Sequence, residues 1–277
     1  VRETKDDALV AKIIRNIAYP ASLDYYIKNP QDFLTDRTAI EAISDFLKKG
    51  YKDLVTVNER AYELFGDEKF FKGGEKSRSR GETALKRLGL DYSSIGCIET
   101  PEPFFSFQKK DFFQKESRNI YIIENKDTFW SFKKQTMDSP SKLEADMLIY
   151  GEGKKIISSF RFVDEYDIDP GSDTFIYFGD LDPEGVNIYC ELREQYTRYK
   201  IVPFFEGYKA ILKIGLERVG GPAKTPRHQR VSRENIDGFL TGFDDTAGMK
   251  IKKLLTDGCY IPQEALSATK LKEMFGA

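Results

Sequence analysis

An acidic stretch, DTFIYFGDLDPEGVNIYCE at residues 173–191, carries the side chains best suited to chemistry in this chain. Asp180 and Asp182 directly follow an apolar run, and Glu184 and Glu191 complete a set of four acids around a glycine. Carboxylates at this spacing suit a calcium loop, a phosphatase nucleophile or a divalent-metal centre that acts on phosphate. The neighbouring residues decide between these three hypotheses.

The spacing nearly matches an EF-hand calcium loop, with Asp180, Asp182 and Glu184 at positions one, three and five and Glu191 at position twelve. An EF-hand loop follows a helix, however, whereas the preceding FIYFG is rich in β-formers and ends in glycine. A haloacid-dehalogenase-type phosphatase also places D-x-D after a strand, but Glu184 stands where that pattern commonly has Thr. Both hypotheses are therefore disfavoured.

The metal-centre hypothesis depends on the neighbouring strands. From residue 118 onwards, apolar runs alternate with helix-compatible segments, which predicts βαβ units around a parallel sheet covered on both faces; the runs lie in RNIYIIEN, ADMLIYGEG, DTFIYFGDLD and KIVPFF. The carboxyl ends of parallel strands meet at one edge of a sheet, and here they carry Glu124, the turn at Glu152, and Asp180 with Asp182. We expect Glu152 to be a plain turn residue.

Acids that converge in this way need either protons or a cation. Close carboxylates repel one another strongly at low dielectric. Oxygen ligands without a nearby Cys or His favour Mg²⁺ or Mn²⁺ over zinc. The sequence therefore predicts a magnesium or manganese centre at this edge of the sheet.

Composition limits the remaining classes. The 277 residues are 40% hydrophobic, which is enough for one large domain or two ordinary ones, and the net charge is only −2, so any nucleic-acid binding must use local patches. Cys97, Cys190 and Cys259 form no C-x-x-C pair, and the single histidine, His228, disfavours histidine-based hydrolases. No apolar run approaches the roughly 20 residues that span a bilayer. We expect a soluble, cytoplasmic protein without a membrane partner.

The chain divides, on this evidence, into a helical domain at residues 1–117 and an α/β catalytic domain at residues 118–277. DRTAIEAISDFLKKG predicts a helix that opens on an Asp36 N-cap and stops at Gly50, and SRGETALKRLGL predicts a second amphipathic helix. Short helices with basic connectors suit a winged-helix-like DNA-binding module.

These residues resemble a known fold. A Glu that ends the first strand, a glycine-bearing turn after the second and D-x-D-x-x-G after the third are similar to the TOPRIM fold of topoisomerases, primases and related nucleases. GDLDPEG also resembles the motif of type IIB topoisomerase A subunits and of the meiotic recombination transesterases. A narrower resemblance is to the JetD family, the TOPRIM nuclease subunits of Wadjet plasmid-defence systems. The stretches that carry it are ELFGDEK (63–69), YIIENKDTF (121–129), YFGDLDPEGVNIY (177–189) and IPQEAL (261–266).

The resemblance implies a divalent-metal-dependent endonuclease that hydrolyses duplex DNA. Glu124, Asp180 and Asp182 would be the catalytic, metal-binding acids, and Glu184 a further ligand or a group that positions water. The partners would be duplex DNA and condensin-like SMC subunits, and the oligomer a homodimer. Two alternatives stay open: a topoisomerase-like transesterase that uses a tyrosine such as Tyr51 or Tyr62, and a DNA-binding module without catalysis.

Basic residues in two clusters are the predicted DNA contacts, because such clusters suit phosphate binding. The first cluster consists of Lys72, Lys76, Arg78 and Arg80, and the second of Lys224, Arg227, Arg230 and Arg233. Lys126, which directly follows Glu124 and Asn125, is a further candidate for phosphate contact.

Overall fold

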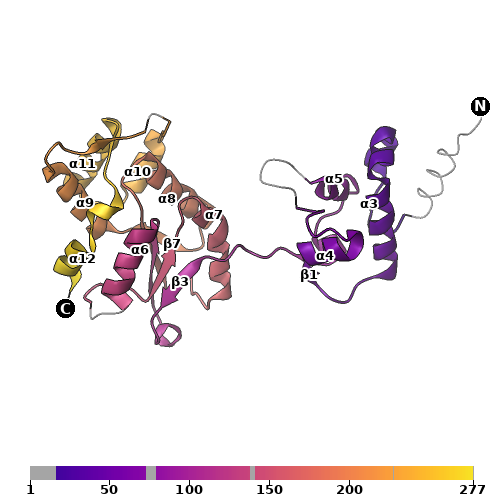
Figure 1. Ribbon diagram of the computed structural model, residues 1–277, viewed down its shortest axis with the longest axis horizontal. Helices are drawn as coiled ribbons and strands as arrows, with labels where there is room; N and C mark the ends of the chain where they lie inside the picture. The colour runs from indigo at the N-terminus through magenta and orange to yellow at the C-terminus, as the bar shows by residue number, and fades with distance from the viewer. Residues whose placement is uncertain (1–16, 73–78, 138–140, 227, 277) are drawn as a thin grey trace, which may run out of the picture. The chain divides into compact units, whose positions relative to one another are not determined.

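The computed structural model describes residues 17–72, 79–137, 141–226 and 228–276 (Figure 1). The chain forms two compact units, one ending at Thr100 and the other beginning at Pro101. The predicted boundary at residue 117 lies inside the second unit, because the strand β3 (Phe105–Gln108) pairs with a strand of that unit's sheet. The sequence hypothesis had assigned this strand to the helical part.

The first unit is mostly helical, as predicted. Its elements are α2 (Asp24–Lys28), α3 (Pro30–Lys49), β1 (Val55–Thr56), α4 (Val57–Phe65), α5 (Arg80–Arg87), the 3₁₀ turn η1 (Ser93–Ile95) and β2 (Cys97–Ile98). The strands β1 and β2 form a short parallel pair. Thr56 caps α4 in a reciprocal capping box with Glu59. The winged-helix assignment remains a prediction for this unit.

The helix α3 begins earlier than predicted. It starts at Pro30, a residue suited to a first helical turn, and the predicted N-cap at Asp36 is wrong. Asp36 is instead 2% exposed within the helix, where it accepts a hydrogen bond of 2.9 Å from the Tyr26 hydroxyl and pairs with Arg87 at 2.7 Å. The predicted end at Gly50 is confirmed, since this glycine is the C-cap with φ of 69°.

The second unit is a mixed α/β structure around a five-stranded sheet of order β3-β5-β4-β6-β7. All neighbours are parallel except β3, which runs antiparallel at one edge. The remaining strands of the sheet are β4 (Asn119–Ile123), β5 (Met147–Tyr150), β6 (Thr174–Phe178) and β7 (Lys200–Pro203). These four are the apolar runs that the sequence predicts.

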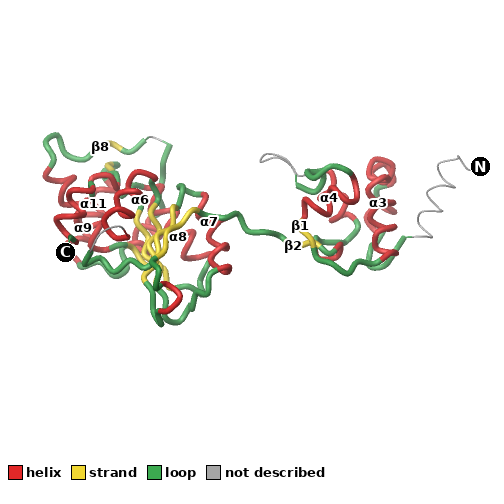
Figure 2. Tube along the Cα trace, turned by 60° about the horizontal axis from the view of Figure 1, so that its bottom comes forward, coloured by secondary structure: helices red, strands yellow, loops and turns green. Residues whose placement is uncertain are grey.

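Helices lie on both sides of the sheet, so the unit has three layers (Figure 2). The helical elements are η2 (Phe112–Gln114), α6 (Lys126–Phe132), the π-helix η3 (Lys133–Met137), α7 (Lys155–Ser159), η4 (Phe160–Glu165), α8 (Pro183–Gln195), α9 (Phe205–Glu217), α10 (Arg233–Phe239), α11 (Asp245–Thr256), η5 (Gln263–Ala265) and α12 (Ala268–Phe275). A short antiparallel pair, β8 (Ala223–Lys224) with β9 (Cys259–Tyr260), completes the unit.

The strands are apolar on both faces because both faces are covered. On β6, the buried Tyr177 ring packs against Tyr189 of α8, whereas the next residue, Phe178, packs against Phe132 of α6. Full burial of such a ring contributes about 1.5–3 kcal/mol. The predicted sheet covered on both faces is therefore confirmed.

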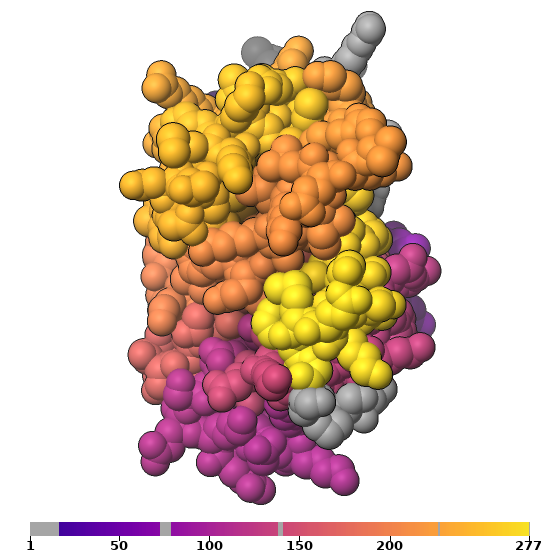
Figure 3. Space-filling model, turned by 90° about the vertical axis from the view of Figure 1, so that its left-hand side faces the viewer, coloured from indigo at the N-terminus to yellow at the C-terminus, as the bar shows by residue number. Residues whose placement is uncertain are grey.

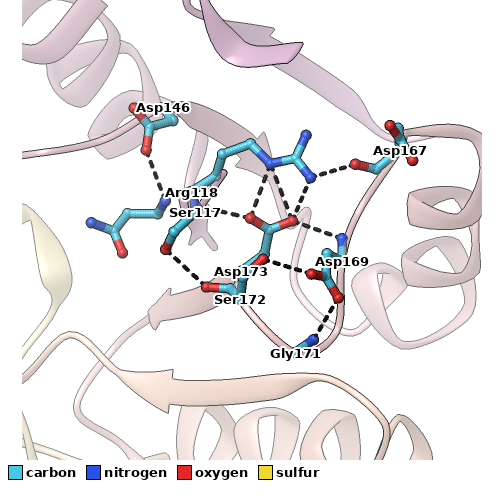
Figure 4. A network of polar contacts seen from close by, with 9 residues as sticks. Ser117, Arg118, Asp146, Asp167, Asp169, Gly171, Ser172 and Asp173 are labelled. Carbon is cyan, nitrogen blue, oxygen red and sulfur yellow. Dashed lines mark hydrogen bonds and ion pairs between the residues drawn. The ribbon is translucent and has the colours of Figure 1, made fainter. Parts of the chain in front are cut away.

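A buried ion pair fixes the start of the sheet. Arg118 precedes β4 and Asp173 precedes β6, and their side chains bond at 2.6 Å while being 6% and 0% exposed (Figure 4). Asp173 also accepts hydrogen bonds from the backbone N–H groups of Arg118 and Asp169, both at 2.8 Å. Because β4 and β6 pair directly, this clamp sets the register that brings residues 124 and 180 to the same edge.

The C-terminal segment crosses to the same edge. Leu181 and Ile261 exchange backbone hydrogen bonds of 2.9 and 3.2 Å, which places η5 beside the acidic stretch. The Ile261 side chain packs against α9 at Gly215. In Figure 3 this yellow segment lies side by side with the orange segments that precede it in the chain.

Candidate metal centre

Glu124 lies directly after β4, at the carboxyl end of the strand. Its N–H donates to the carbonyl of Phe178 at 3.0 Å, which continues the pairing of β4 with β6 beyond the last ladder residue. Its Oε2 atom accepts a hydrogen bond of 2.7 Å from the buried Tyr177 hydroxyl. The pKa of Glu124 is raised to about 7, chiefly by burial and also by the charges of Asp180 and Asp182, while the hydrogen bond from Tyr177 lowers it.

Asp180 comes two residues after β6 and is held by two donors. The backbone N–H of Gln263 lies 2.8 Å and the Asn125 amide nitrogen 3.2 Å from its Oδ1 atom. Burial nevertheless raises its pKa to about 6, with contributions from the charges of Glu264 and Asp182. The Asp180 carboxylate is therefore harder to ionise than a free aspartate, and a bound cation would compensate its charge.

Asp182 is the N-cap of α8. It is 6% exposed, and its Oδ1 atom accepts a hydrogen bond of 2.7 Å from the N–H of Gly185. Burial raises its pKa, while hydrogen bonds from Gly185 and from the Gln229 side chain lower it. The cap explains the local turn, and the Pro183 that follows suits the first position of the helix.

Two glycines give the acidic turn its close packing. A Cβ atom at position 179 would lie 2.1 Å from Glu124 Oε2, and one at position 185 would lie 2.3 Å from the Asp180 carbonyl oxygen. The Gly179 N–H also donates a hydrogen bond of 2.9 Å to the Tyr208 hydroxyl. Only glycine leaves room at these two positions for the Glu124 carboxylate and for the backbone of Asp180.

The more peripheral acids behave differently. Glu184 is partly exposed and pairs with Lys154 at 3.3 Å, although its charge raises the pKa of Asp182. Glu152 is exposed in a turn with φ of 54° and pairs with Lys155 at 2.9 Å, as expected for a plain turn residue. Glu191, which would be the twelfth residue of a calcium loop, is instead an exposed residue of the helix α8.

Sequence reasoning missed the contribution of the C-terminal segment. Glu264 accepts a hydrogen bond of 3.0 Å from the Asn125 amide, which also contacts Asp180, so a fourth carboxylate joins the cluster. Gln263 lies beside it, fully buried, with no hydrogen-bond partner for its side-chain amide among the described residues. The stretch IPQEAL is one of those that carry the family resemblance, and Glu264 within it could have been proposed as a further acid of the site.

The donor set suits a hard divalent cation. It consists of oxygen atoms. Burial raises the pKa values of all three acids, the charges of Asp180 and Asp182 add to the rise at Glu124, and that of Asp182 adds to the rise at Asp180, a cost that a cation would relieve. Within the part of the chain that the structure describes, no group of three His, Cys, Asp or Glu residues is placed so that it could hold a metal ion as it stands. Sharing one ion therefore requires rotation of these side chains.

The predicted DNA contacts lie in several places. Lys126 is exposed at the first position of α6, next to the Asn125 that contacts Asp180, and Arg230 is exposed in the loop before α10. Arg80 is in the first unit, where its guanidinium donates to the carbonyl of Thr35. Lys76, Arg78 and Arg227 lie outside the described residues. Lys72, Lys224 and Arg233 are exposed.

The candidate tyrosines of the transesterase alternative belong to the first unit. Tyr51 stacks on Phe46, and its hydroxyl donates to the carbonyl of Ser93 at 3.0 Å. Tyr62 is 65% exposed on α4.

Among the described residues no helix is long and apolar enough to cross a membrane.

The raised pKa values of Glu124 and Asp180 predict that the free energy of unfolding falls as pH rises. Between the unfolded and folded pKa values of Glu124 and Asp180, the folded chain binds more protons, so unfolding becomes easier from about pH 4 to pH 7. In EDTA at pH 8, Glu124→Gln should therefore stabilise the protein by roughly 1–3 kcal/mol, because it removes a buried charge and keeps an acceptor for Tyr177.

Thermal unfolding monitored by circular dichroism at pH 5 and pH 8 measures this effect. The gain should shrink at pH 5, where the native carboxyl is already protonated. If the Glu124→Gln protein is less stable than the wild type at pH 8, the ionised Glu124 carboxylate does not destabilise the folded chain, and the prediction is wrong.

One family model matches about two thirds of the chain. The family model described as Wadjet protein JetD, C-terminal, matches residues 88–269. This range contains the whole sheet, Glu124, Asp180, Asp182 and η5. A search of curated proteins found no match.

Proposed function

The chain belongs to the family of Wadjet JetD C-terminal regions, and on this premise we propose that it is the nuclease subunit of a Wadjet-type plasmid-defence system. It hydrolyses phosphodiester bonds of duplex DNA with the help of Mg²⁺ or Mn²⁺. The observation that carries the proposal is the convergence of Glu124 and Asp180 with Asp182 at the carboxyl edge of the sheet, with each acid raising the pKa of Glu124. The arrangement supports a TOPRIM catalytic domain.

Glu124, Asp180 and Asp182 are the residues that would hold the cation, with Glu264 and Glu184 nearby. When bound, a divalent cation neutralises phosphate charge and makes a coordinated water more acidic. Its charge would offset the desolvation that raises the pKa values of these three acids.

The surrounding residues position these acids. Tyr177 fixes the Glu124 carboxylate by donating to its Oε2 atom. Asn125 donates to Asp180 and Glu264 together, and so couples the strand β4 to the C-terminal segment. Lys126, exposed one residue further on, would contact a DNA phosphate.

The proposed partners follow from the family. Duplex DNA would approach the acid cluster along basic side chains that include Lys126 and Arg230, while Lys76, Arg78, Arg80 and Arg227 are further proposed contacts. Condensin-like SMC subunits would present the DNA, the first unit would act as a winged-helix-like DNA-binding module, and a homodimer would permit two cuts on opposite strands.

Supercoiled plasmid incubated with the protein and Mn²⁺ or Mg²⁺ tests the proposal. We expect nicked and linear products that disappear in EDTA and whose ends are free of protein after denaturation. Cleavage that continues in EDTA would contradict a metal-dependent reaction. Protein covalently attached to the DNA ends would favour the tyrosine alternative instead.

A further inference from the structure

A groove opens beside the first turn of α8, next to the cap residue Asp182 in the chain. It has a volume of about 740 Å³ and lies between the first turn of α8, the loop before α10 and the end of α11. Pro183 lines it, and so does Gln229, whose side chain also bonds to Asp182. The volume lies within the range of about 300–1,000 Å³ that is typical of small-molecule sites.

Two buried polar atoms on the groove wall have no protein partner. They are the Thr225 hydroxyl and the Gln229 Oε1 atom, neither of which bonds to any described residue. A buried acceptor without a partner costs about 1–3 kcal/mol, so such atoms usually meet a ligand or water. Both residues line the groove and lie four positions apart in the same loop.

The contact with Asp182 fixes which end of the Gln229 amide faces the groove. A carboxylate only accepts hydrogen bonds, so the NH₂ group of Gln229 must point to Asp182. The carbonyl oxygen is then the free end, and it can only accept. Its natural partner is an amino group, such as the exocyclic amine of adenine or cytosine.

The rest of the groove suits a nucleotide. Pro183, Pro226 and Val231 offer flat or apolar surface for a base, while Arg230 and Arg233 stand exposed at the rim. A third rim cation, Lys252, is paired with Asp237 at 2.6 Å. Arg230 forms no ion pair with a described residue, so its charge is available to a phosphate.

We propose that this groove binds one nucleotide, with its amino-bearing base against Gln229 and Thr225 and its phosphate at Arg230. The inference rests on the proposed function in one respect, since a DNA strand at the acid cluster would supply this nucleotide from the position next to the cut. Through Gln229, the bound base would also orient Asp182, which makes Gln229 a positioning residue.

Binding measured in EDTA tests the groove without any cleavage. Deoxyadenosine monophosphate (dAMP), deoxyribose 5-phosphate and inorganic phosphate are titrated against the full chain by calorimetry. We expect dAMP to bind at least about tenfold more tightly than deoxyribose 5-phosphate, because only dAMP carries a base. Thr225→Val should weaken dAMP about three- to tenfold, which is the loss of one hydrogen bond.

Thr246→Val is the matched control, since Thr246 is exposed on α11 and lines a different hollow. It should bind dAMP as the wild type does. Arg230→Gln should weaken dAMP and inorganic phosphate alike. Equal affinity for dAMP and deoxyribose 5-phosphate, or an unchanged Thr225→Val protein, would overturn the inference.

A short single-stranded oligonucleotide distinguishes the two possible sources of the nucleotide. If the groove serves a DNA strand, the oligonucleotide displaces dAMP and binds more tightly than dAMP does. If it serves a free nucleotide, dAMP stays bound. A protein that binds dAMP but cuts no plasmid would support the nucleotide groove and contradict the proposed function. A protein that cuts plasmid but does not bind dAMP would support the proposed function and contradict the nucleotide groove.

Discussion

Asp180→Ala lowers the metal-dependent nicking rate of supercoiled plasmid by about a thousandfold or more. The acid is held by the Gln263 N–H and is close enough to Glu264 and Asp182 for their charges to raise its pKa, so its loss removes one ligand of the donor set. Loss of a single preorganised group that stabilises transition-state charge costs about 10²–10³ in rate, and loss of a metal ligand also lowers occupancy of the site. Initial rates at fixed Mn²⁺ concentration measure the effect.

Glu191→Gln provides the control for this experiment. Glu191 belongs to the same acidic stretch but lies exposed on α8, so its removal should leave the nicking rate unchanged. If the Asp180→Ala protein nicks at the wild-type rate, the acid cluster is not the catalytic centre. If Glu191→Gln is as inactive as Asp180→Ala, the loss reflects the general acidity of the stretch.

We expect Arg118→Met to destabilise the second unit by about 3–5 kcal/mol. It leaves Asp173 fully buried without its partner, and an uncompensated buried charge is among the costliest single changes. The double variant Arg118→Met with Asp173→Asn should recover part of the loss, because no unpaired charge remains. Urea denaturation followed by far-UV circular dichroism measures both free energies.

An exposed pair supplies the comparison. Lys270 and Glu273 bond at 2.7 Å on α12 with both side chains about half exposed. Lys270→Met should cost less than about 1 kcal/mol. A loss below about 1 kcal/mol for Arg118→Met as well would contradict the view that this clamp sets the register of β4 and β6.

The strands of the sheet were predictable because their burial on both faces leaves long apolar runs. β3 was not, since FSFQ is a short edge strand with exposed Phe105 and the antiparallel partner that defines it is more than 35 residues away. The prediction of Asp36 as an N-cap was wrong for a similar reason, because its partners are distant in the chain. Acids at helix starts are common caps, but here distant Arg87 and Tyr26 compensate a buried aspartate inside the helix.

Glu124, Asp180 and Asp182 could be grouped from the sequence, because parallel strands bring their carboxyl ends to one edge of a sheet. The groups that hold these acids could not be predicted in this way. Gln263 contacts Asp180 across 83 positions of the chain, and Gln229 reaches Asp182 from a polar loop without periodic pattern. Such contacts depend on the path of the C-terminal segment over the sheet edge, which local sequence does not encode.

Calorimetric titration of the full chain with Mn²⁺ at pH 7.5 tests the central claim most directly. The structure predicts that the wild type and Glu191→Gln bind Mn²⁺ with equal affinity. It predicts that Glu124→Gln binds at least about tenfold more weakly, because the substitution removes a charged ligand while keeping the hydrogen bond from Tyr177. Mn²⁺ binding that is the same in the wild type and in Glu124→Gln would contradict a metal centre built on Glu124, Asp180 and Asp182.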